Sequence, residues 1–144
     1  MLSQDRLLRF SRLERDGEQL RARFAALTSA HRYFQGPAAL RSVSVSDPRE
    51  DGSIEAVFMG VRVRFRMVFI FSDDFDARGR VMCTHCHGAY GYPVEESIGA
   101  FTFDTEGITD LESGIDGRVV ALHADAPQIV LAFLERAIAA SRCL

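Results

Sequence analysis

The stretch Val61-Arg62-Val63-Arg64-Phe65-Arg66-Met67-Val68-Phe69-Ile70-Phe71 decides the fold of this 144-residue chain. Its odd-numbered positions are all apolar, and arginine occupies the even-numbered positions as far as Arg66. Successive side chains of a strand point to opposite faces, so the pattern predicts a long strand with one apolar and one charged face. From Val68 onward the odd- and the even-numbered positions are all apolar, which predicts that this end of the strand is covered on both faces.

Two amphipathic helices are predicted, one on either side of the strand region. In the first, apolar residues recur at three- and four-residue steps from Leu13 to Phe34, and Gly36-Pro37 ends the pattern. Gly17 lies in the same stripe, where it marks either a bend or a close crossing. In the second, Asp125 is the expected N-cap and an apolar stripe runs from Ile129 to Ile138.

The region between the helices predicts further strands joined by short turns. They are expected at residues 40–45, 54–58, 80–83, 99–103, 108–111 and 118–123. The similar segments Phe75–Gly79 and Phe103–Gly107 each predict a turn that ends in a glycine with positive φ. Short turns join antiparallel neighbours. We therefore predict one α+β domain over residues 1–144, a curved antiparallel meander of six to seven strands with both terminal helices packed on one face.

The composition favours a soluble globular protein and narrows its partners. The chain is 47% hydrophobic and 26% charged, with a formal net charge of -3, which argues against nucleic acid as a partner. No apolar run approaches the roughly 18 residues of a membrane span. The start of the sequence has no pattern of a secretory signal, and we expect a cytoplasmic protein with reduced thiols.

The segment Cys83-Thr84-His85-Cys86-His87 is the sharpest chemical motif. It resembles the attachment motif of c-type haem, which would imply thioethers at Cys83 and Cys86 and His87 as iron ligand. That attachment normally follows export, so haem is not expected. Zinc is the alternative, with Cys83 and Cys86 as thiolates and His85 or His87 adding nitrogen. The fourth ligand would then be His31, His123, Cys143 or water.

The same motif also fits a purely structural role. In an extended strand Cys83, His85 and His87 share one face and Cys86 points away, so these side chains would simply fill the end of a strand. A redox dithiol is not expected, because no helix begins at Cys83 to lower the pKa of its thiol. Glu95 and Glu96 follow closely, as carboxylates that could act as acid or base beside His87.

Two functions follow from these patterns. The first is a binding or interaction module, more readily than an enzyme, with an apolar groove between sheet and helices for a small apolar ligand or a partner's segment, within a homodimer. The expected ligand-binding residues are Phe65, Met67, Phe69, Phe101 and Phe103, with Tyr90 and Tyr92 from a neighbouring loop. The second is a zinc protein, hydrolytic if its fourth ligand is water, centred on the motif from Cys83 to His87. The arginines of the central strand would bind an acidic partner or pair with cross-strand acids such as Glu55.

Overall fold

The chain folds into one antiparallel sheet with helices at either end of the sequence. The computed structural model describes residues 2–89, 92–112 and 118–141. The seven strands pair in chain order, so the sheet is the predicted meander. The elements are α1 (Gln4–Ala25), the 3-10 turn η1 (Ala26–Thr28), α2 (Ser29–Gln35), β1 (Val43–Val45), β2 (Ile54–Phe58), β3 (Val61–Phe71), β4 (Ala77–Ala89), β5 (Tyr92–Phe103), β6 (Ile108–Glu112), β7 (Val119–Ala121) and α3 (Ala126–Ala140).

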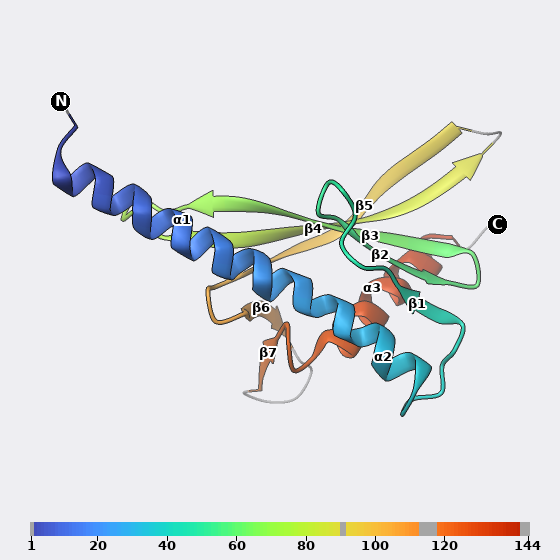
Figure 1. Ribbon diagram of the computed structural model, residues 1–144. Helices are drawn as coiled ribbons and strands as arrows, with labels where there is room; N and C mark the ends of the chain where they lie inside the picture. The colour runs from blue at the N-terminus through green and yellow to red at the C-terminus, as the bar shows by residue number, and fades with distance from the viewer. Residues whose placement is uncertain (1, 90–91, 113–117, 142–144) are drawn as a thin grey trace.

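The sheet is curled around the helices, and its longest strands are central. Figure 1 shows α1 crossing the sheet as one long rod, with the β3–β4 turn beside its N-terminal half. The β4–β5 hairpin projects at the opposite end, and α3 lies under the middle of the sheet. The predicted α+β class, with a curved sheet and terminal helices on one face, is therefore confirmed. No helix among the described residues is both long and apolar enough to cross a membrane.

The core forms where α3 meets the odd-numbered side chains of β3. Val63 and Phe65 are fully buried, as their alternation with arginine predicts. The Phe133 ring of α3 packs perpendicular to Phe65 at 5.8 Å between centroids and stacks on Phe101 of β5 at 5.9 Å. Phe133 thus joins β3 and β5 across β4, and its burial holds α3 on the sheet.

Replacing Phe133 with alanine tests this account of the core. The Phe133→Ala variant should lose about 3–5 kcal/mol of unfolding free energy in urea, because the change leaves a cavity between two buried rings. Ile138→Ala is the matched control on the same helix: Ile138 is 40% exposed, and its loss should cost about 1 kcal/mol or less. Equal losses for the two variants would show that α3 does not pack through Phe133.

The N-terminal helical region differs from the single predicted helix. It ends at Gln35, just before Gly36-Pro37 as predicted, but η1 interrupts it at Ala26–Thr28. Gly17 marks a close crossing rather than the break, since the Phe69 ring of β3 lies 3.5 Å from where a side-chain Cβ on Gly17 would be. A side-chain Cβ there would make an ordinary van der Waals contact with the ring, so the crossing is close without requiring glycine.

One predicted turn is displaced, and the cause is packing. The turn after β3 spans Ser72–Asp76, with positive φ at Phe75, and β4 already begins at Ala77. Gly79 lies within β4, where the Phe103 ring occupies the space that a side chain would need. Gly79 is thus required by close packing and not by the turn. The second predicted turn is confirmed: Gly107 has φ 84° and its N–H bonds to the Asp104 carbonyl.

Asp125 does not cap α3 with its side chain as predicted. Its buried carboxylate instead accepts hydrogen bonds from the Ala121 N–H and from Arg118, both at 2.9 Å. The side chain therefore ties β7 to the start of α3. The first helix is capped by a side chain, because the Ser3 hydroxyl oxygen accepts the Arg6 N–H at 3.2 Å.

The arginines on the charged face of β3 form ion pairs with acidic side chains of neighbouring strands. Glu55 of β2 is buried opposite Arg64 and also binds Arg62, at 2.7 Å, and Arg49. Arg64 makes a second ion pair with Glu95 of β5 at 2.6 Å. This is the cross-strand pairing with Glu55 that the sequence predicts.

Candidate functional site

The motif from Cys83 to His87 lies entirely within β4, so its side chains alternate between the two faces of the sheet. Cys83 is fully buried in the core, directly opposite Phe65 of β3. Cys86 lies on the other face, 3.9 Å from the Thr84 hydroxyl and 3.8 Å from the Glu95 carboxylate. The structure therefore does not bring the two thiols together.

The placement of Cys83 and Cys86 on opposite faces bears on zinc binding and on haem attachment, the two roles that need both cysteines. Burial raises the pKa of the Cys83 thiol far above its ordinary value, which keeps it protonated. A thiol buried in the core cannot be reached by an ion or a porphyrin that Cys86 holds on the other face of the sheet. Within this fold, Cys83 and Cys86 cannot hold one ion or one haem edge between them.

Thiol labelling tests the placement of the two cysteines. In the native protein iodoacetamide should modify Cys86 and leave Cys83 unmodified, because only the thiolate of an accessible cysteine reacts. Cys83 should react once the chain is unfolded in urea, and peptide mass spectrometry assigns each adduct. Native labelling of Cys83 at the rate of Cys86 would contradict the buried placement.

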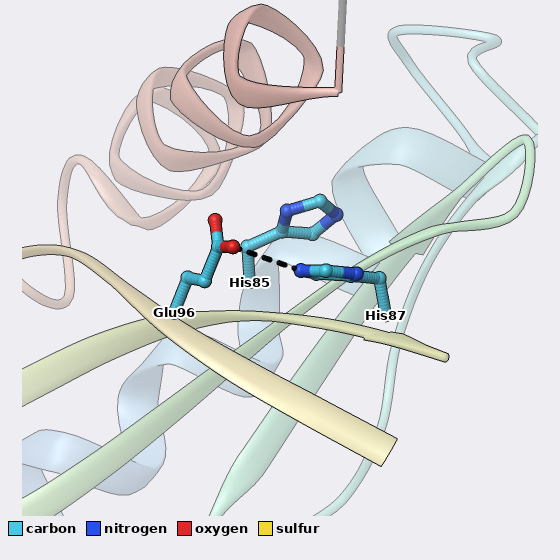
Figure 2. Close-up of side chains that lie close together, drawn as sticks. All are labelled: His85, His87 and Glu96. Atoms are coloured by element: carbon cyan, nitrogen blue, oxygen red, sulfur yellow. Dashed lines mark ion pairs between the residues drawn. The ribbon is translucent and has the colours of Figure 1, made fainter. Parts of the chain in front are cut away.

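His85 and His87 share the inner face of β4, and the structure adds Glu96 to them. Glu96 is the direct cross-strand partner of His85 on β5. One ligand atom from each of the three side chains lies within 4.8 Å of the others. The two rings are 4.9 Å apart between centroids, and His87 Nε2 is 3.2 Å from a Glu96 carboxylate oxygen. Figure 2 shows the three side chains pointing toward one another from the two strands.

The environment of His85 disfavours the charged form of its ring. The ring is buried, and its Nε2 lies 3.3 Å from the hydroxyl of Ser141 just after α3. Burial lowers the pKa of His85, and the nearby His87 ring lowers it further, while Glu96 raises it in part. Nδ1 of His85 is buried and has no hydrogen-bond partner among the residues that the structure describes.

The other predicted metal ligands lie elsewhere or cannot be placed. His31 of α2 accepts a hydrogen bond at Nδ1 from the Val45 N–H of β1, at 3.0 Å, and so completes the sheet edge. His123 is exposed and is not part of the cluster of His85, His87 and Glu96. Cys143 lies outside the described residues.

The residues predicted to line an apolar groove divide into two groups. Phe65, Phe101 and Phe103 are buried core residues and line no open groove. Met67 and Phe69 line a cavity of about 720 Å³ at the edge of β3. Tyr90 lies outside the described residues, as does the side chain of Tyr92. The cavity is also lined by other residues of β3 and by residues of α1, of the loop after β1 and of β4, which are Arg21, Phe24, Ala25, Pro48, Asp51, Gly52, Arg66, Val68 and Met82.

The cavity lies where β3 extends beyond β2. The β2–β3 register ends at the pair Ile54 and Phe65, whereas β3 pairs with β4 as far as Phe71. Met59 and Gly60 both have positive φ, which defines a two-residue hairpin in which Phe58 and Val61 form a hydrogen-bonded pair. Because hydrogen-bonded pairs recur at every second residue, the odd-numbered residues of β3 direct their backbone N–H and C=O groups toward β2. Beyond Phe65 these groups face an edge without a partner strand in the part of the chain described.

The apolar end of β3 is not covered on both faces as predicted. Val68 is 41% exposed and Phe71 62% exposed. Near this edge the Arg21 guanidinium lies 5.0 Å above the Phe69 ring and makes no ion pair with any described residue. Arg66 is 3.9 Å from Asp51. The cavity thus combines an open strand edge, apolar side chains and an unpaired cation.

Sequence reasoning could not find the residues of α1 that line this cavity. Arg21 and Phe24 lie 40 and 37 positions before the start of β3, and nothing in their local pattern shows which strand they meet. Comparison with known proteins adds no functional residue: no protein-family model, no curated protein and no solved structure matches this chain.

Proposed function

We propose that this protein is a binding module that takes an extended segment of a partner protein along the open edge of β3. The observation that carries the proposal is the overhang of β3, which leaves the outward backbone groups of Met67, Phe69 and Phe71 without a strand beside a cavity of about 720 Å³. An extended peptide would satisfy these groups by adding a strand. The cytosol, where free thiols persist, is the compartment we expect for this binding.

The cavity offers different surroundings to successive side chains of such a peptide. Met67 and Phe69 lie on the inner face of the sheet with Phe24 of α1 behind them, whereas Val68 and Met82 lie on the outer face. Lining residues from both faces place the cavity across the strand edge itself. A peptide with apolar residues at alternate positions would bury them between α1 and β3.

Charge gives the peptide a second expected feature. Arg21 carries the unpaired cation, and Arg66 has only long contacts, 3.9 Å to Asp51 and 3.8 Å to Glu95. The Asp51 carboxylate is already engaged, because it accepts hydrogen bonds from the hydroxyl and N–H of Ser53, which lower its pKa. An acidic residue in the peptide would pair with Arg21 or Arg66 and fix its direction.

The edge strand β1 shows how this fold closes an edge elsewhere in the sheet. At β1, the Gln35 side chain of α2 donates to the Val43 carbonyl at 2.8 Å and His31 accepts the Val45 N–H. No described side chain makes a hydrogen bond to the outward backbone groups of Met67, Phe69 or Phe71. An uncovered apolar edge favours pairing with another strand. Because α1 and the loop at Pro48–Gly52 flank the cavity, a single peptide fits more readily than the edge of a second folded copy.

The proposal is tested by removing one outward N–H while keeping the fold. Short random peptides displayed on phage are selected on the wild-type protein and then measured against two variants. Met67→Pro removes the outward N–H, which an edge strand tolerates, and Met67→Ala removes the side chain alone. Selected peptides should show alternating apolar residues and an acid, and should bind Met67→Pro about threefold to tenfold more weakly than Met67→Ala.

Three outcomes would overturn the proposal. Equal affinity for Met67→Pro and Met67→Ala would mean that no backbone pairing occurs at this edge. Selection of no peptide, with a small apolar compound occupying the cavity instead, would make the protein a small-molecule carrier. Sedimentation as a dimer that Met67→Pro dissociates would make a second copy of this chain the occupant.

A further inference from the structure

The side chains of His85, His87 and Glu96 form a second, independent site that shares no residue with the cavity at β3. Two histidines two positions apart on a strand place both rings on one face, and the β4–β5 register sets Glu96 directly opposite His85. Two rigid strands therefore fix three donor groups of mixed nitrogen and oxygen character. This donor set does not depend on either cysteine.

The hydrogen bonds around Ser141 fix the tautomer of His85. A hydroxyl has one proton, and Ser141 donates it to the Ala137 carbonyl at 2.8 Å. Because that proton is used, the Ser141 oxygen must accept the hydrogen bond that joins it to Nε2 of His85 at 3.3 Å. Nε2 of His85 therefore carries the ring proton. Nδ1 is consequently an unprotonated lone pair, buried and without a partner among the described residues. A metal-bound histidine is normally oriented by a hydrogen bond from its other ring nitrogen in this manner.

The remaining two groups lie on the solvent side of His85. The side chains of His87 and Glu96 are 39% and 55% exposed, and they already lie 3.2 Å apart. An ion entering from solvent would meet these two groups before the buried Nδ1 of His85. Small rotations of exposed side chains are enough to bring donors within 4.8 Å to the spacing that a bound ion needs.

We propose that His85, His87 and Glu96 bind one divalent transition-metal ion of the zinc class. Two imidazoles and a carboxylate suit zinc and cobalt, whereas calcium and magnesium prefer oxygen ligands alone. Three protein ligands leave a coordination position for water or a ligand, which is the pattern of an open site and not of a closed structural one. The thiols of Cys83 and Cys86 take no part.

Cobalt titration of the purified full-length protein, with its absorption spectrum recorded, tests the site. We expect one equivalent of Co²⁺ per chain, a visible band of nitrogen and oxygen ligation and no near-ultraviolet thiolate band. His87→Ala and Glu96→Gln should each weaken binding by at least about tenfold. Both positions are exposed, so circular dichroism should show the native fold in both variants. Cys86→Ser is the matched control and should bind as the wild type does.

A stability measurement gives a second readout. Stoichiometric Zn²⁺ should raise the thermal midpoint of the wild type and of Cys86→Ser, since an ion that binds only the folded state stabilises it. His87→Ala should show no such rise. Binding of no ion, a thiolate band that Cys86→Ser abolishes, or unchanged affinity in both His87→Ala and Glu96→Gln would each overturn the site. None of these results bears on the edge of β3.

Discussion

Burial of the odd-numbered side chains of β3 against α3 is the interaction on which the rest of the structure depends. Val63 and Phe65 are fully buried, and Phe133 joins Phe65 to Phe101 two strands away. Because one face of β3 is committed to this core, its arginines must lie on the other face, where Glu55 and Glu95 pair them. The same burial sets the register by which β4 places Cys83 in the core and His85 beside the end of α3.

Unequal strand lengths produce both candidate sites. β3 continues past the pairing with β2, which exposes a strand edge. β4 continues past the end of its pairing with β3 at Cys86, which carries His87 outward with β5. In each case a long strand is held rigidly on one side and is free on the other. Rigid support with one free side is what a binding site requires, since its groups are positioned before a ligand arrives.

Local patterns in the sequence predicted the parts of this fold that depend on local physics. The alternation of Val61–Phe71 predicted the bounds of β3, and Gly107 predicted its turn. Two of the failures involve a partner distant in sequence, because Gly79 packs against the Phe103 ring and the predicted groove residue Phe65 packs against Phe133. In the third, Asp125 binds the nearby Arg118 in place of the helix end. The His cluster shows the same limit: the register shift between β4 and β5 near Thr84 determines that Glu96, and not Ser97, faces His85.

Hydrogen exchange along β3 tests most directly the claim that this strand is paired on one edge only beyond Phe65. Amides of Arg66, Val68 and Ile70 face β4 and should exchange slowly in the native protein, as bonded core amides do. Amides of Met67 and Phe69 face the open edge and should exchange much faster. Alternating protection from residue 66 to residue 70, measured by NMR, is the predicted result. Equal protection of all five amides would contradict the open edge.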